Sequence, residues 1–596
     1  MKKIIVSTLA GLALVSSAKA AKAAPTLEAL LPAETVLVVA APDYATAKQH
    51  FKASASGQFW DSAEFKPFRK KLSDGFKANV LVKIEEALAV DFEAFEEMAS
   101  GPVALAVVAG GGDVPEPSLL LLLDAGRKSF TLRRTLSRME RGWKKEGHEV
   151  SDLEIGGIDF VTVSDPGSSE KVHVGRVGAQ LIVGSAAGQI EGVLARLDGK
   201  GGNALAGNPA FAADHGTLLK GVDFYLWANL GQVIPQILDN APDGAELGID
   251  FGELFGSLGL NGLGTIAINY SERPDGAHSD IFVGMPEAKR TGLFGLLETK
   301  RADAAPPAFV PDSAVAFTRW RVDMGAAWNN LEALLLELSP DVANMVEFTV
   351  GLLGKDKDPN FDFKKSFLKN FGDDLMLFQM PANGLSINDL GSGPMVALVK
   401  SPDPAGLIQG IGAVPGILPP PLNEAALEPR ELGGHTVHSF GVMELPDPST
   451  GELVASEVFF AVKDGYLAIA TDTDLMRGLL DSKAQTPLAK RERLASAAAV
   501  VGGIDSGFFG YQNDRAMISN VMDTLRANSD QFEMIFSMIP MEGLDEVGLD
   551  SWFDFSVLPK GEEVAKYFDI TVYGAAIDAR GVTLKMFSPR PPGLKR

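Results

Sequence analysis

Residues 181–197, LIVGSAAGQIEGVLARL, and residues 467–483, LAIATDTDLMRGLLDSK, spell out the same pair of elements twice. Each segment opens with a short apolar run that is typical of a buried strand, and continues with apolar residues at helical spacing. Such a match between distant segments predicts that the chain contains two copies of a larger unit.

Further matches follow in the same order along both parts of the chain. LPAETVLVV from Leu31 matches VPDSAVAFT from Val310, and EIGGIDFVTV from Glu154 matches ELGGHTVHSF from Glu431. Across six such pairs the difference in numbering stays between 271 and 286, a drift that short insertions explain. The remaining pairs begin at Asp91 and Asp362, Ser118 and Pro394, and Trp227 and Tyr511.

These matches predict two pseudo-repeated domains, the first spanning residues 26–300 and the second residues 306–590. We expect residues 301–305 to be a linker, because the surrounding ETKRADAAPPAFVP combines charge, alanine and paired prolines. A pseudo-symmetric pair of domains that share an interface is the arrangement we expect.

Within each copy, neighbouring strands are mixed with helices, which favours an α+β fold with a mostly antiparallel sheet and helices packed on it. VLVVAAP and SLLLLLDA are typical strands, and a long helix is expected from Arg127 to about Lys145. A hairpin turn is expected at Asp275-Gly276, and another turn at Gly156-Gly157. Four recurring polar residues precede helices and are predicted N-caps: Asp43, Asp323, Asn229 and Asn513.

The first 23 residues are typical of a secretory signal peptide. Two lysines precede an apolar stretch from Ile4 to Val15, and small residues follow at Ala18-x-Ala20. This stretch is shorter than the roughly 20 residues that a spanning helix requires, so we expect it to be removed. We therefore expect an exported protein, periplasmic or extracellular, with no integral membrane span after signal removal.

The composition excludes several functions. The chain has no cysteine, which excludes disulfides, thiolate metal sites, a cysteine nucleophile and a lipid anchored through cysteine. Its net charge of -23 argues against nucleic acid as a partner, because nucleic acid rewards clustered Lys and Arg. With 46% apolar residues the chain can bury several cores of ordinary size.

Two patterns suggest metal binding and fail on spacing. In HTVH, His435 and His438 lie three residues apart in an expected strand, so they face opposite sides of the sheet. DKDPNFD places oxygens at alternate positions, but phenylalanine stands where a calcium loop needs glycine and glutamate. The oxygen-bearing residues of the DKDPNFD loop are Asp356, Asp358, Asn360 and Asp362. No metal site and no cofactor is predicted.

Catalytic motifs are incomplete in the same way. Asp505-Ser506-Gly507 is similar to the loop of aspartic proteases, but the first copy has Phe224 where the second loop would need its small residue. Ser366 and Lys369 match S-x-x-K without the accompanying motifs. No catalytic residue is predicted. Paired carboxylates remain open, because sequence does not show which acids meet in space.

The remaining candidate is apolar. MIFSMIPM, residues 534–541, concentrates methionine beside an aromatic residue, and methionine adapts to irregular apolar ligands as readily as it fills cores. GILPPPL, residues 416–422, adds a stiff apolar loop. The residues proposed to bind an apolar ligand are Met534, Phe536, Met538 and Met541.

LPAETVLVVAAPD from Leu31, GQFWDSAEFKPF from Gly57 and FVPDSAVAFTRW from Phe309 resemble the opening of exported bacterial proteins grouped as a domain of unknown function. In that family an LPADT-like strand leads to a helix and an FKPF-like segment. The resemblance covers about 40 residues closely. It implies an envelope location and a tandemly duplicated α+β build, and it supplies no catalytic residue.

The sequence thus favours an uncharacterised exported cell-envelope protein that binds an apolar ligand or a protein partner without catalysis. One alternative is a carboxylate-dependent hydrolase at the domain interface. Another is a structural component of the envelope. Co-purified lipid would favour the first, and a deep acidic cleft the second.

Overall fold

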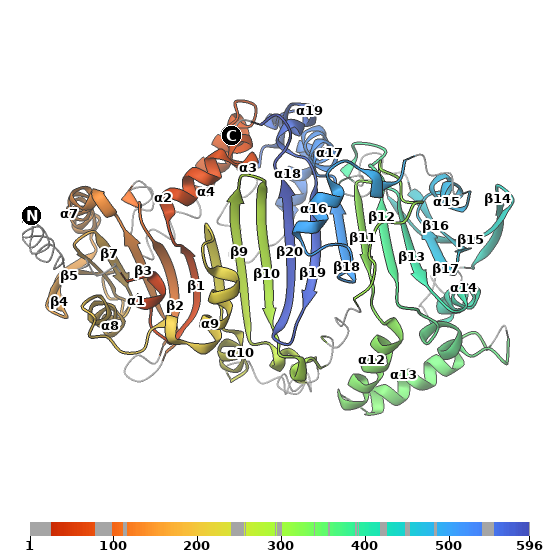
Figure 1. Cartoon of the computed structure of the whole chain (residues 1–596), viewed down its shortest axis with the longest axis horizontal. Coiled ribbons are helices and arrows are strands. Elements are labelled where there is room, and N and C mark those ends of the chain that lie inside the picture. Colours follow the sequence, from red (N-terminus) through yellow and green to blue (C-terminus); the bar gives the residue numbers. More distant parts are fainter. Residues whose placement is uncertain are drawn as a thin grey trace, which may run out of the picture.

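A computed structural model gives the structure of the chain. It describes residues 25–77, 98–110, 116–239, 256, 258–291, 294, 301–338, 340–355, 358–387, 390, 393–417, 426–446, 453–481, 486–538 and 553–594. In these residues twenty strands form one continuous antiparallel sheet that runs the length of the molecule (Figure 1).

The first half supplies ten strands, which lie side by side in the order β4-β5-β6-β7-β3-β2-β1-β8-β9-β10. Their bounds are β1 Thr35–Ala41, β2 Val103–Val108, β3 Ser118–Asp124, β4 Glu149–Ile155, β5 Ile158–Ser164, β6 Val172–Val177, β7 Gln180–Gly184, β8 Phe224–Ala228, β9 Thr265–Arg273 and β10 Gly276–Gly284.

The second half repeats this order in its own ten strands, as β14-β15-β16-β17-β13-β12-β11-β18-β19-β20. Their bounds are β11 Ala316–Trp320, β12 Leu375–Gln379, β13 Met395–Lys400, β14 Glu428–Leu432, β15 His435–Pro446, β16 Leu453–Lys463, β17 Tyr466–Ala470, β18 Phe508–Gln512, β19 Thr571–Ile577 and β20 Gly581–Pro589.

The two halves meet where β10 pairs with β20 in the middle of the sheet. This ladder is symmetric, since Gly276 lies opposite Pro589, Gly284 opposite Gly581, and Asp280 opposite Lys585 at its centre. Both strands also show the same succession of buried and half-buried residues. Two units that share one sheet therefore form a single body.

Helices flank the sheet, so the predicted α+β class with a mostly antiparallel sheet is confirmed. Those of the first half are α1 Leu27–Leu30, α2 Tyr44–Ala53, α3 Ala55–Trp60, α4 Lys66–Phe76, α7 Ser129–Glu146, α8 Ala187–Leu197, α9 Pro209–Asp214 and α10 Leu230–Asp239. Those of the second half are α12 Met324–Leu338, α13 Pro340–Leu352, α14 Pro404–Ala413, α15 Thr473–Leu480, α16 Leu494–Val500, α17 Asp514–Ala527, α18 Ser529–Met538 and α19 Gly561–Val564.

Each half buries its own core against one face of the sheet. Trp227 and Phe211 are fully buried in the first core, where α1, α8 and α9 pack. Phe317 and Phe509 are buried in the second core, where α15 and α16 pack. At the two ends of the sheet, α7 and α14 cover the opposite face as well.

Local signals in the sequence are matched by the structure. β7 leads into α8 and β17 into α15, as the opening pair of segments predicts. Gly156 and Gly157 form a turn with φ of 55° and 80°, values that favour glycine, and Gly433 and Gly434 do the same in the second half. The Asp43 and Asn513 side chains accept hydrogen bonds from the first turns of α2 and α17, which confirms both predicted caps.

Asp323 and Asn229 also stand immediately before helices, namely α12 and α10. The side-chain amide of Asn229 donates to the Gln232 side chain at 3.4 Å.

A cavity at the junction of the two halves

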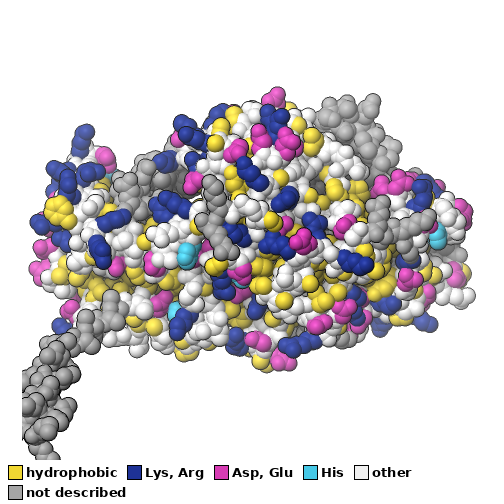
Figure 2. All heavy atoms as spheres, turned by 45° about the horizontal axis from the view of Figure 1, so that its top comes forward, with side chains coloured by type: hydrophobic (Ala, Val, Ile, Leu, Met, Phe, Trp, Pro, Cys, Tyr) yellow, Lys and Arg dark blue, Asp and Glu magenta, His cyan; other side chains and the backbone are white. Residues whose placement is uncertain are grey.

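Both halves of the sheet expose apolar side chains on the face opposite the two cores. Val39 is 45% exposed and lies across from Leu105, while its neighbours Val38 and Ala40 point into the first core. In the second half Leu377, between buried Met376 and Phe378, is 41% exposed. Figure 2 shows hydrophobic side chains between charged ones across the middle of the molecule.

Apolar rows cross the junction on this same face. Ile268 of β9 pairs with Ile281 of β10, which pairs with Leu584 of β20, and all three side chains are half-buried. A parallel row begins at Ile266 and passes through Val283 to Val582. An apolar floor thus extends from one half to the other.

Helices from both halves meet above one end of these strands. Figure 1 places α3 and α4 beside α17, α18 and α19 over the ends of β9, β10 and β20. Phe65 and Phe68 of the first half pack with Met522 and Phe555 of the second in a small core of their own. The rings of Phe68 and Phe555 stack with centroids 6.0 Å apart. This cluster holds the two sets of helices together.

Beneath these helices lies a cavity of about 410 Å³. One wall is apolar and comes from Met517, Ile518 and Val521, which recur at helical spacing on α17. The other walls come from the ends of β9, β10 and β20, from the first residues of α3 and from residues 567–570. Both halves therefore build the cavity.

Glu272 brings a carboxyl group to the cavity from the end of β9. It accepts a hydrogen bond from the Tyr270 hydroxyl at 2.5 Å, and burial raises the pKa of Glu272. The backbone N–H of Glu272 donates to Asp223 at 2.8 Å, and His50 Nδ1 lies 2.8 Å from the other oxygen of that carboxylate. The neighbouring Asp223 charge also favours the protonated form of Glu272.

Asp514 brings a second carboxyl group, as the first residue of α17. It accepts a hydrogen bond from the Thr571 hydroxyl, which lies 2.6 Å from the Ser588 hydroxyl. Burial raises the pKa of Asp514 to about 6, and the nearby Asp569 adds to the rise. Among the described residues no basic side chain forms an ion pair with Asp514.

Asp569 and two arginines complete the polar part. Arg493 pairs with the Asp569 carboxylate and donates to the backbone oxygen of Arg590 at 2.9 Å. The Arg590 guanidinium donates to the backbone oxygen of Ala53 at 3.0 Å, and its backbone N–H donates to Asp275 at 2.8 Å. These contacts tie the end of β20 to the first half.

The cavity is therefore amphipathic. It can hold an apolar chain against α17 and a polar group between Glu272 and Asp514. A carboxyl group with a pKa near 6 could also take up or release a proton near neutral pH.

Of the side chains proposed from the sequence, the structure describes that of Met534. Met534 is on α18, 56% exposed, and does not line the cavity. Phe536 and Met538 belong to α18, but their side chains lie outside the described part of the structure, as does all of Met541. Most of GILPPPL, from residue 418 on, is also outside the described residues.

The sequence did contain a signal for the cavity. Asp514, Met517, Ile518 and Val521 stand at i, i+3, i+4 and i+7, inside the segment from Tyr511 that matches the first copy. Only the pairing of β10 with β20 shows that this stripe faces a cavity between the halves.

The weaker sequence motifs form local contacts. His435 lies 3.4 Å from Asp481, and no group of three His, Asp or Glu side chains in the described residues could hold a metal ion. In the DKDPNFD loop Asp358 and Asp362 accept backbone hydrogen bonds, while Asp356 lies outside the description. Ser506 donates to the backbone oxygen of Phe508 in a turn before β18.

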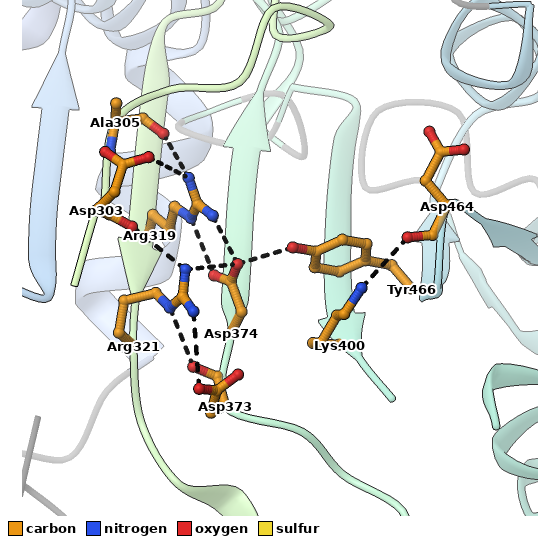
Figure 3. A network of polar contacts seen from close by, with 9 residues as sticks. All are labelled: Asp303, Ala305, Arg319, Arg321, Asp373, Asp374, Lys400, Asp464 and Tyr466. Atoms are coloured by element: carbon orange, nitrogen blue, oxygen red, sulfur yellow. Dashed lines mark hydrogen bonds and ion pairs between the residues drawn. The ribbon is translucent and has the colours of Figure 1, made fainter. Parts of the chain in front are cut away.

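A second polar cluster lies in the core of the second half (Figure 3). Asp374 is only 2% exposed and accepts from Arg319 at 3.0 and 2.7 Å and from the Tyr466 hydroxyl at 2.8 Å. Burial and the Asp374 carboxylate raise the pKa of Tyr466 to about 12, which keeps the hydroxyl protonated. Arg321 approaches the same carboxylate at 3.3 Å.

This cluster also holds the segment that the sequence suggests as a linker. Arg319 donates to the backbone oxygen of Ala305 at 2.9 Å, and fully buried Ala304 donates to Ile504 at 2.7 Å. Because the groups are buried and engaged with one another, we assign this cluster to stability.

Comparisons with known proteins add little. No family model matches the chain, and no curated protein matches it. Solved structures of TP0453 show a weak likeness: crystal form I has a TM-score of 0.23 and 12% identity over 45% of this chain and 81% of that one. Crystal form IV has a TM-score of 0.24 and 13% identity over 43% and 79%.

These TM-scores are too low to support an inference about function. The described part of the chain contains no helix long and apolar enough to cross a bilayer.

Proposed function

We propose that this chain is an exported, non-enzymatic binding protein that holds an amphiphile, an apolar chain with a polar head, in the cavity between its halves. The observation that carries the proposal is the cavity of about 410 Å³, whose lining combines the apolar side chains of α17 with the carboxyl groups of Asp514, at the start of that helix, and Glu272, at the end of β9. Its volume lies in the range of roughly 300–1,000 Å³ that is typical of small-molecule sites.

The surroundings support the same assignment. The apolar rows that cross β9, β10 and β20 continue from the cavity along the sheet, and burying them under a ligand chain is favourable. Export is supported by the N-terminal pattern of lysines, apolar core and small residues.

The test uses a matched pair of methionines. Met517→Asp places a charge in the apolar wall, whereas Met534→Asp places one on exposed α18. The full chain is expressed, purified without detergent and extracted for lipid mass spectrometry. We expect the parent protein and Met534→Asp to carry a bound amphiphile and Met517→Asp to lose it.

Two further measurements make the result decisive. Circular dichroism melts establish that Met517→Asp is folded, and Val521→Trp blocks the same wall without introducing a charge. Loss of ligand in Met534→Asp but not in the other two variants would move the site to α18. A parent protein that carries and binds no amphiphile would refute the proposal.

A hydrolase is the second candidate, because two half-buried carboxyl groups with raised pKa values line one cavity. An acid and a base in different environments can divide the roles of general acid and general base. The test is activity on chromogenic esters and glycosides. Hydrolysis that Asp514→Asn abolishes would favour this candidate over simple binding.

A further inference from the structure

The described lining of the cavity carries more acidic than basic side chains. Its described lining contains three carboxyl groups, from Glu272, Asp514 and Asp569, and one guanidinium group, from Arg590. Any head group that enters therefore meets more potential negative charge than positive.

The basic groups around the cavity are already engaged. Arg493 pairs with Asp569, and Arg590 donates to the backbone oxygen of Ala53. Arg515, the next residue on α17, is exposed and donates to the backbone oxygen of Phe568 at 3.1 Å. Lys566 pairs with Glu64 at 2.8 Å on the outer surface. To bind an anionic head, Arg493 and Lys566 would have to leave the carboxylates of Asp569 and Glu64. Burial raises the pKa of Glu272, and the nearby Arg590 charge offsets part of that rise.

Among the described residues, Asp514 is a carboxyl group of the cavity lining with which no cationic side chain forms an ion pair. Its neighbours are the Thr571 hydroxyl, the carboxylate of Asp569 and the apolar side chains of α17. A buried carboxylate without a cation is costly, and the N-terminus of α17 offsets only part of that cost. A ligand ammonium group would supply the missing charge together with N–H donors.

We propose that the cavity selects amphiphiles whose head is an ammonium group, with Asp514 as its principal partner and Glu272 on the opposite side. This inference rests on the proposed binding function. The site itself rests on the cavity, and the carboxyl groups decide only which head it accepts.

The experiment compares three ligands with the same twelve-carbon chain: dodecylamine, dodecanol and dodecanoate. Binding to the full chain is measured by isothermal titration calorimetry at pH 7.5, below the critical micelle concentrations of dodecylamine and dodecanoate and below the solubility limit of dodecanol. We expect dodecylamine to bind about tenfold or more tightly than dodecanoate, with dodecanol between them, as one buried charge-assisted hydrogen bond would give.

Two variants identify the residue. Asp514→Asn keeps the shape and should lower dodecylamine affinity about tenfold, to the level of dodecanol. Asp198→Asn removes an exposed carboxylate immediately after α8, which pairs with Lys200 at 3.5 Å, and should not change dodecylamine affinity. Unchanged dodecanol binding by Asp514→Asn shows that the variant is folded and its cavity intact.

The possible results separate the head-group inference from the proposed binding function. Dodecanoate binding as tightly as dodecylamine, or a preference for the amine that survives in Asp514→Asn, would overturn the head-group inference and leave the binding function standing. Failure of all three ligands to bind would overturn both.

Discussion

Replacing Asp374 with alanine should strongly destabilise the second half of the molecule. The carboxylate is 2% exposed and receives four contacts of 3.3 Å or less, two from Arg319, one from Arg321 and one from Tyr466. Removing it leaves the largely buried Arg319 guanidinium with only the exposed Asp303 carboxylate, 3.7 Å away. Breaking a buried pair in this way costs about 3–5 kcal/mol.

Urea denaturation followed by circular dichroism measures the loss. If the second half unfolds with a slope of about 3 kcal/mol per molar urea, its midpoint should fall by roughly 1 M or more. Hydrogen exchange of the β11 and β12 amides then shows whether the loss is confined to the second half.

The chain offers a matched control in the preceding residue. The Asp373 side chain is 46% exposed and lies 3.7 Å from Arg321, so Asp373→Ala should cost no more than about 1 kcal/mol. The double variant Arg319→Met with Asp374→Leu removes both charges and should recover much of the stability lost in Asp374→Ala. Equal midpoints for Asp373→Ala and Asp374→Ala would refute the assignment of this cluster to stability.

Three more perturbations test other parts of the fold. Asp214→Ala leaves the Trp227 indole and Thr265 hydroxyl without their buried acceptor, and a thermal melt should show a loss of about 2–5 kcal/mol in the first half. Gly581→Ala puts a Cβ atom 2.2 Å from a backbone oxygen of β10, so hydrogen exchange of β10 and β20 should accelerate. Burial raises the pKa of Asp514 from 3.8 to about 6, so its contribution to stability is fully present below pH 4 and is lost as pH rises through 6. In the Asp514→Asn variant the free energy of unfolding should fall less between pH 4 and 7. At pH 7 it should exceed that of the parent protein by at most about 3 kcal/mol, measured by urea titration.

Much of the architecture could be predicted from residue order, because strand and helix periodicity and turn chemistry are local. The strand and helix of residues 181–197 and their counterpart, the paired glycines at 156–157 and the cap at Asp43 all follow from neighbouring residues. The equal strand order of the halves is what a tandem repeat predicts. Duplication, the signal peptide and the family resemblance stay predictions.

The site could not be predicted in the same way. The methionine-rich segment stands out by its composition, yet Met534 is exposed and is not among the residues that line the cavity. Glu272 and Asp514 are separated by more than two hundred residues, and no local pattern shows that such acids share a cavity.

Residue order alone thus predicts many of the strands and helices, and it predicts that the chain holds two copies of one unit. Only the folded chain decides that β10 pairs with β20, because that pairing depends on two strands from different halves presenting matching edges. The same pairing brings β9 and α17 together around one cavity, so the environment of Glu272 and Asp514 is a property of tertiary structure. Burial and neighbouring charge, which shift a pKa and create a binding cavity, depend on distance in space rather than on distance along the chain.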